Sequence, residues 1–181
     1  MIGIKTNRLT IRPFRETDIE DLFELYNDES TCRFLLHEAW NASSKNENAL
    51  KKIAANRLTP NTAASLACVL DGKVIGDISI WYTDMKETVE IGFAFHHAYA
   101  GKGYATEAVE AMIDYLFTVV KVHRIQANLD ARNAPSAKLC QRVGMRKEAH
   151  FMKDYWSKGE WTDSFVFGML LSDFQKRGTS E

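Results

Sequence analysis

The chain has 181 residues, of which 45% are hydrophobic, and its 23 basic and 24 acidic residues give a formal net charge of −1 at pH 7. This length favours one domain, taken as residues 1–181, with enough apolar residues for a core. The balanced charge argues against a nucleic-acid-binding surface and against an acidic, disordered arm. Neither a signal peptide nor an apolar run that could span a bilayer is visible, so we expect a cytoplasmic protein that binds no membrane.

The cysteines and histidines form no pattern typical of a disulfide framework or a metal site. The chain has three cysteines, an odd number, and none of them has CxxC spacing: Cys32, Cys68 and Cys140. His96 and His97 are adjacent, and on a strand they would point to opposite faces. We therefore expect no metal ion and a reducing compartment.

The first third of the chain predicts one strand followed by helices. Residues 8–14 alternate between polar and apolar and indicate a strand. Thr17 and Glu20 have capping-box spacing and would open a helix over residues 18–28. The polar, interrupted stretch 29–58 predicts one or two further helices, with a mobile loop at 41–48 close to a site.

The next segments predict three neighbouring antiparallel strands. Residues 64–70 and 74–82 are apolar and β-branched, and Asp71-Gly72-Lys73 between them favours a hairpin turn. Residues 88–96 follow as a third strand. The turns between these strands are too short for helical crossovers.

The spacing of apolar residues changes in the second half of the chain. Apolar residues at three- and four-residue spacing over 105–120 predict an amphipathic helix, followed by a strand at 123–129. Residues 133–145 predict a short helix that Asn133 can cap and Gly144 can end. The tail predicts a strand pair over 151–171 that turns at 157–159. Hairpins followed by a strand-helix-strand crossover indicate an α+β fold with a mixed sheet and helices packed on it.

A loop rich in glycine and other small residues separates the third strand from the amphipathic helix. The first N–H groups of a helix lack internal partners and favour an anion, and glycine lets a bulky diphosphate approach the backbone. We expect this site to bind a phosphorylated cofactor, although a tight turn with a glycine cap would give the same pattern. The register excludes a P-loop and a dinucleotide fingerprint, and it disfavours an NAD-binding oxidoreductase. The backbone N–H groups in question belong to Gly101, Lys102, Gly103, Tyr104 and Ala105.

The order of these segments resembles the GNAT superfamily of N-acetyltransferases over nearly the whole chain. That family's Gln/Arg-x-x-Gly-x-Gly/Ala signature falls on residues 100–105, where Gly103 and Ala105 match and Ala100 departs from it. Residues 6–25 and 154–170 resemble the opening and closing segments of the subgroup that acetylates the amino termini of ribosomal proteins. The resemblance implies a single domain with a mostly antiparallel sheet, one splayed parallel strand pair and flanking helices.

The resemblance also implies acetyl-CoA as the cofactor, lying between the strand before the loop and the strand after the helix. The strand backbone would pair with the pantetheine arm, and residues 101–106 would hold the pyrophosphate. A bulge near Gly92 would direct an N–H at the thioester carbonyl, unless Gly92 is simply a strand glycine under a large neighbour. The implied cofactor-binding residues are Phe93, Ala94, Phe95, Ala100, Gly101, Lys102, Gly103, Tyr104, Ala105, Thr106, Asn133 and Ser136.

Attack of a neutral amine on a thioester needs a proton acceptor, and the departing thiolate can take a proton from a donor. Glu90, in the strand before the loop, is the best base, with Glu87 and Asp77 as weaker choices. Many relatives place a tyrosine where this chain has Cys140, so its thiol and the hydroxyl of Ser136 are the two candidate proton donors. Cys140 could equally be a small core residue. We favour direct transfer over an acetyl-cysteine intermediate.

The acceptor is the amine, and the resemblance favours the α-amino terminus of a protein. Trp81 and Tyr82 at the end of a central strand, together with Arg33 and His37, are the candidate acceptor-binding residues, although packing in the core would also explain Trp81 and Tyr82. A small amine, such as a polyamine, an amino acid or an aminoglycoside-like compound, is the alternative acceptor. A non-catalytic CoA-binding module is a further alternative. The aromatic tail hairpin could pair with a second copy of the chain or close its own core.

Overall fold

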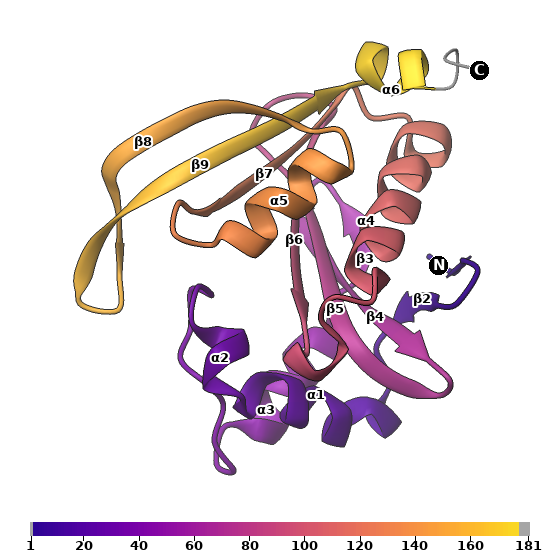
Figure 1. Cartoon of the computed structure of the whole chain (residues 1–181). Coiled ribbons are helices and arrows are strands. Elements are labelled where there is room, and N and C mark those ends of the chain that lie inside the picture. The colour runs from indigo at the N-terminus through magenta and orange to yellow at the C-terminus, as the bar shows by residue number, and fades with distance from the viewer. Residues whose placement is uncertain (1, 178–181) are drawn as a thin grey trace.

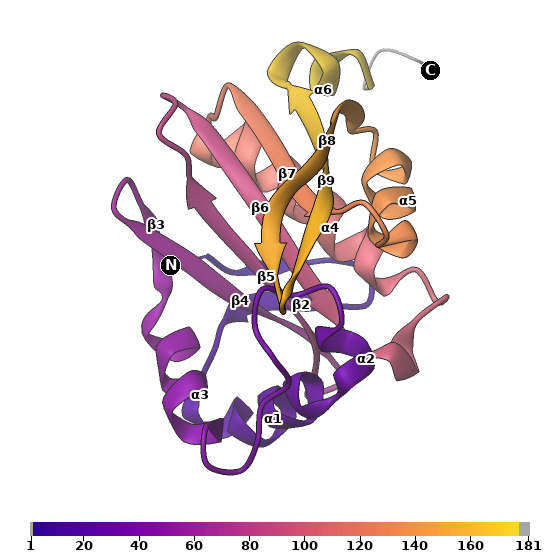
Figure 2. The ribbon, with the colours of Figure 1, turned by 90° about the vertical axis from the view of Figure 1, so that its left-hand side faces the viewer.

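A computed structural model describes residues 2–177 and shows one mixed sheet with helices on both faces (Figures 1 and 2). The sheet has nine strands in the order β1-β2-β4-β5-β6-β7-β9-β8, and β3 pairs with β4 outside this path. Their bounds are β1 (Ile4–Lys5), β2 (Thr10–Pro13), β3 (Asn56–Thr59), β4 (Thr62–Leu70), β5 (Lys73–Tyr82), β6 (Thr88–Phe95), β7 (Arg124–Asp130), β8 (Arg146–Ser157) and β9 (Glu160–Leu170).

Each face of the sheet carries its own group of helices and its own core. The helices are α1 (Ile19–Asn27), α2 (Glu29–Cys32), α3 (Lys45–Ala54), α4 (Tyr104–Tyr115), α5 (Ala134–Arg142) and α6 (Leu171–Arg177). The larger core contains buried residues of α4 and α5, and the smaller core contains those of α1 and α3. Among residues 2–177, no helix is both long and apolar enough to cross a membrane.

The predicted amphipathic helix and the two predicted turns are confirmed. Ala108, Val109, Met112 and Ile113 of α4 are all fully buried against the sheet, which is the face that the three-four spacing of apolar residues predicts. Asp71-Gly72 turns the β4–β5 hairpin with φ values of 47° and 86°. Lys158-Gly159 turns the β8–β9 hairpin with φ values of 50° and 81°. Both turns therefore use the left-handed region that glycine tolerates best.

The mostly antiparallel sheet is also confirmed, and its parallel pair is β6–β7. These two strands pair only from Thr88 to Glu90 on β6 and from Arg124 to Gln126 on β7. Beyond that point β6 stays on β5 as far as Phe95, and β7 stays on β9 as far as Asp130. The centre of the sheet therefore divides into two halves that separate from each other.

The structure differs from the sequence expectations near the amino terminus. The predicted capping box of Thr17 and Glu20 does not form, because a 3-10 turn over Glu16–Asp18 comes first and Asp18 precedes α1. The Asp18 carboxylate instead accepts hydrogen bonds from the Arg15 N–H at 2.8 Å and from the Arg12 guanidinium at 2.7 and 2.9 Å.

Other differences concern the extent of elements. Half of the predicted loop at 41–48 is the first turn of α3, because α3 begins at Lys45. Strands β1 and β3 and helix α6 were not predicted, and they are short elements of two to seven residues. The tail hairpin begins at Arg146 rather than at residue 151.

Candidate active site

The gap between β6 and β7 exposes a backbone edge, and hydrogen bonds at the two ends of β6 show which residues form it. The Thr83 N–H donates to the Thr88 carbonyl, and the His96 N–H donates to the Ile75 carbonyl. Backbone groups alternate along a strand, so the even-numbered residues of β6 bond to β5. The N–H and C=O groups of Phe93 and Phe95 therefore face the gap.

Two expectations for β6 are corrected by this alternation. The backbone groups of Ala94 point at β5, so they do not face the gap as Phe93 and Phe95 do. The register between β5 and β6 is continuous from Gly76–Phe95 to Tyr82–Val89, so no bulge occurs at Gly92 in these strands. A Cβ on Gly92 would lie 3.4 Å from the Trp81 ring. Gly92 is thus the strand glycine under a large neighbour, and Phe93 supplies the nearest N–H that faces the gap.

The glycine loop leaves the start of α4 open to a ligand. Gly101 and Gly103 have φ values of 74° and 81°, and Gly103 is the N-cap of α4. Within residues 2–177 no side chain caps this terminus, so the N–H groups of Tyr104, Ala105 and Thr106 lack the usual cap. The start of α5 differs, because the Asn133 side chain accepts a hydrogen bond from the Ser136 N–H at 3.2 Å. An anionic diphosphate fits the donors at the start of α4.

The other predicted loop residues have the following surroundings. Ala100 and Lys102 are exposed, and the Lys102 ammonium lies 5.9 Å from the centre of the Tyr99 ring. The Thr106 hydroxyl accepts a hydrogen bond from the Arg142 guanidinium of α5 at 2.9 Å. The first turn of α4 is therefore tied to the last turn of α5.

Glu90 stands where β6 and β7 separate. Its side chain accepts hydrogen bonds from the Gln126 amide and from the Asn128 amide, both at 2.9 Å and both on the Oε2 atom. Trp81 is its partner across the β5–β6 ladder and lies on the same face of the sheet. Two neighbouring amides thus fix the orientation of the carboxylate and leave its second oxygen available for a proton.

The weaker base candidates occupy unsuitable places. Asp77 is 2% exposed, accepts a hydrogen bond from the Tyr26 hydroxyl at 2.6 Å and forms an ion pair with Lys52. Its carboxylate is fully engaged in joining β5 to α1 and α3. Glu87 is exposed in the turn before β6, and its backbone carbonyl accepts a hydrogen bond from the His123 N–H at 2.8 Å.

The structure contradicts Cys140 as the proton donor. Its thiol lies in the larger core with 0% exposure, and burial raises its pKa to about 12. Such a thiol reaches neither solvent nor the gap, and it packs as the small core residue that its helix position also allowed. Ser136, in the first turn of α5, is half-buried and is the remaining candidate.

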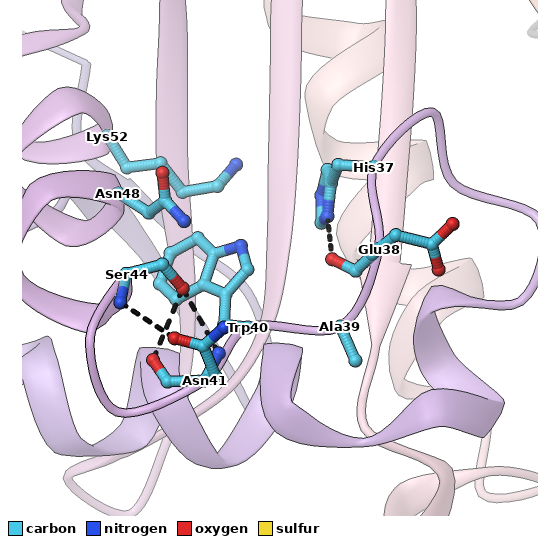
Figure 3. Close-up of a pocket in the computed structure, with 8 residues that line it drawn as sticks. All are labelled: His37, Glu38, Ala39, Trp40, Asn41, Ser44, Asn48 and Lys52. Atoms are coloured by element: carbon cyan, nitrogen blue, oxygen red, sulfur yellow. Dashed lines mark hydrogen bonds between the residues drawn. The ribbon is translucent and has the colours of Figure 1, made fainter. Parts of the chain in front are cut away.

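Two adjoining pockets lie on the sheet face that carries Glu90. The first, of about 470 Å³, has His37 on one side and Lys52 and Asn48 on the other, with Trp40 at its base (Figure 3). The second, of about 710 Å³, includes Arg33. Its full lining is Glu29, Ser30, Cys32, Arg33, Glu38, Ala39 and Lys158.

Of the four predicted acceptor-binding residues, Arg33 and His37 line these pockets, whereas Trp81 and Tyr82 separate. Trp81 lies on the face with Glu90, and Tyr82 packs against the larger core on the opposite face. Sequence reasoning missed Lys158, which lies at the tip of the β8–β9 hairpin. Its ammonium donates a hydrogen bond to the Cys32 carbonyl at 2.7 Å. No sequence pattern connects these two residues, which lie 126 positions apart.

An unpaired strand edge that can bind an amide-containing arm, beside an uncapped helix start that can bind a diphosphate, fits an acyltransferase that uses coenzyme A. Comparison with known proteins gives the family. Residues 8–146 match the acetyltransferase (GNAT) domain, so the chain belongs to the GNAT family and is an acetyl-CoA-dependent N-acetyltransferase. An uncharacterized N-acetyltransferase, YnaD of Bacillus subtilis, is 30% identical over 173 residues, which cover 94% of this chain and 98% of that protein.

Solved structures agree with this fold. An acetyltransferase of the GNAT family from Bacillus anthracis is similar, with a TM-score of 0.84 and 29% identity, and the match covers 94% of this chain and 99% of the other. Two more distant structures hold CoA. One is the spermidine N-acetyltransferase of Vibrio cholerae with CoA and spermine, with a TM-score of 0.77 and 19% identity over 93% of this chain and 98% of that one. The other is RimL, a ribosomal L7/L12 α-N-protein acetyltransferase, with a TM-score of 0.82 and 13% identity over 93% of this chain and 98% of that one.

Proposed function

We propose that this N-acetyltransferase modifies the α-amino terminus of a protein. The supporting observation is the charge balance of the larger pocket, where the carboxylates of Glu29 and Glu38 lie with the cations of Arg33 and Lys158. A polyamine carries several ammonium groups and is best bound by carboxylates without competing cations. A peptide terminus carries a single ammonium group followed by a polar backbone, which suits a mixed lining.

The gap and the loop together are the proposed cofactor site. The backbone edge of Phe93 and Phe95 has room for an amide-containing arm to pair with it, as a strand would. The uncapped N–H groups at 104–106, with Gly101 and Gly103 beside them, would donate hydrogen bonds to the diphosphate. Acetyl-CoA would supply an activated thioester, and the Phe93 N–H is the proposed donor to its carbonyl oxygen as negative charge develops there.

Glu90 is the proposed base. The amine nitrogen forms a bond to the acetyl carbon while the carbon–sulfur bond breaks, and the proton lost by the nitrogen passes to Glu90 directly or through one water. The two amide donors on Oε2 keep Oε1 turned to accept that proton. Ser136 is the proposed hydrogen-bond donor to the thiolate that leaves; the proton that the sulfur takes up comes from solvent through this hydroxyl, which stays protonated.

An acceptor panel tests the proposal. Purified protein, acetyl-CoA and single amines are mixed, and release of free thiol is followed, with peptides of different first residues, spermidine, free amino acids and an aminoglycoside. We expect the highest kcat/KM with a peptide. A higher value with spermidine would replace the peptide by a polyamine, and CoA binding without turnover on any amine would favour a non-catalytic module.

A charge reversal in the pocket sharpens the test. Arg33→Glu with Lys158→Glu turns the larger pocket acidic, so kcat/KM for spermidine is expected to rise relative to peptides. If this double variant leaves the ratio unchanged, the pocket is not the acceptor site. A cytoplasmic location and pairing of the β8–β9 hairpin with a second copy remain predictions.

A further inference from the structure

The segment between β1 and β2 is bound to the first turn of α4 by a single carboxylate. Glu107 Oε1 accepts hydrogen bonds from the Thr6 hydroxyl at 2.6 Å and from the Arg8 N–H at 2.8 Å. Its Oε2 accepts one from Arg8 Nε at 2.6 Å. Three hydrogen bonds therefore join residues about a hundred positions apart, at the helix end that follows the glycine loop.

The Arg8 side chain contacts the glycine loop as well as the Glu107 carboxylate. Arg8 Nη1 donates to the Lys102 carbonyl at 2.9 Å. The guanidinium carbon lies 4.4 Å from the centre of the Tyr104 ring, and Nη2 lies 3.3 Å from where a Cβ on Gly103 would be. The side chain remains 44% exposed to solvent. One cation thus touches three consecutive residues of the proposed diphosphate site.

Glu107 creates an electrostatic conflict that Arg8 resolves. A carboxylate in the first turn of a helix is favourable for the helix, but its negative charge opposes binding of another anion at the same end. Burial opposes ionisation of Glu107, yet hydrogen bonds from Thr6 and Arg8 outweigh it and hold its pKa below the ordinary value. Glu107 is therefore charged at neutral pH. Ala100 adds no polar side chain to the loop. The positive charges that offset the Glu107 carboxylate therefore belong to Arg8 and Lys102.

We propose that Arg8 is a positioning residue for the diphosphate of acetyl-CoA. It neutralises Glu107 and binds the Lys102 carbonyl, which leaves the N–H groups of the loop free for the phosphates. The proposal rests on the diphosphate site inferred above. Arg8 is a residue of the cofactor site that the loop pattern does not reveal, because it lies 94 positions before Lys102.

Binding of CoA to three variants tests this role. Arg8→Gln is expected to raise the Kd for CoA, measured by isothermal titration calorimetry, on the order of tenfold, and by less at high salt. Arg8→Gln/Glu107→Gln is expected to bind CoA more tightly than Arg8→Gln, because the uncompensated carboxylate is gone. Arg146→Gln is the matched control: Arg146 is 49% exposed and pairs with two carboxylates, Glu148 and Asp173, away from the loop.

A donor without phosphates separates this role from a structural brace. With S-acetylpantetheine as the acyl donor, Arg8→Gln is expected to keep the wild-type kcat/KM, while kcat/KM for acetyl-CoA falls. An equal loss with both donors, or a double variant no better than Arg8→Gln, would overturn the proposal. Arg8→Met, which also removes the cation, replaces the Gln variant if that variant does not fold, with the same two donors compared. A wild-type protein that does not bind CoA overturns the proposed cofactor site as well, whereas normal CoA binding by the Arg8 variant overturns this inference alone.

Discussion

Replacing Gly103 by alanine puts a methyl group into the glycine loop at a position whose φ is 81°. A left-handed conformation costs a residue with a Cβ about 1–2 kcal/mol. The reduced freedom of the unfolded chain returns about 0.4–1 kcal/mol. The net loss of stability is therefore about 1 kcal/mol, which corresponds to roughly 2–4 °C in Tm for a chain of this size. The new Cβ also lies 3.3 Å from Arg8 Nη2, so the guanidinium must shift by a few tenths of an ångström.

Gly159→Ala provides the matched control for this change. Gly159 has the same φ of 81° at the tip of the β8–β9 hairpin, and a Cβ there would meet no atom within 4 Å. Differential scanning fluorimetry should show similar losses of Tm for both variants. Calorimetry should show a weakened Kd for CoA, on the order of tenfold, only for Gly103→Ala. Equal CoA affinity in the two variants would refute the placement of the diphosphate on this loop.

Further predictions concern protons. Glu90→Gln should lower kcat by about 10² or more without changing the Kd for CoA, and a wild-type pH–rate profile would remove Glu90 from the mechanism. Ser136→Ala should lower kcat, whereas Cys140→Ala should leave kcat near wild type; native Cys140 should resist thiol reagents until the protein unfolds. Burial, followed by the Asp77 charge, raises the pKa of Tyr26 well above 10. The folded state therefore holds this proton longer than the unfolded state does, so stability should decline as the pH rises above about 10. Tyr26→Phe should flatten that decline in urea titrations while costing about 1–3 kcal/mol at neutral pH.

Short sequence patterns predicted those turns, helix starts and caps that depend only on neighbouring residues. Asp71-Gly72, Gly103 and Asn133 each stand where a turn, a helix start or a cap requires their conformation or side chain, and each was predicted from its neighbours. The divided strand pair came from the resemblance to a family rather than from periodicity. Strand order within a mixed sheet depends on long-range pairing, which a single sequence does not contain.

The residues that sequence reasoning missed or misplaced depend on contacts between distant segments. Cys140 has the spacing of a helix residue near the cofactor, but whether it faces the gap or the core depends on how α5 rests on the sheet. Arg8 and Lys158 reach their partners across 94 and 126 residues, respectively. The bulge expected at Gly92 depended on the match between β5 and β6, and their register continues past Gly92 without a break.

The division of the sheet after Glu90 also affects how fast backbone amides exchange their hydrogens with solvent. Amide protons of Phe93 and Phe95 face the gap and have no strand partner among the described residues, unlike those of Gly92 and Ala94 on the same strand. In the free protein, the amides of Phe93 and Phe95 should exchange their hydrogens for deuterium quickly, whereas those of Gly92 and Ala94 should exchange slowly. A ligand that pairs with this edge should slow the exchange at Phe93 and Phe95 and leave their neighbours unchanged, which would record its position at single-residue resolution.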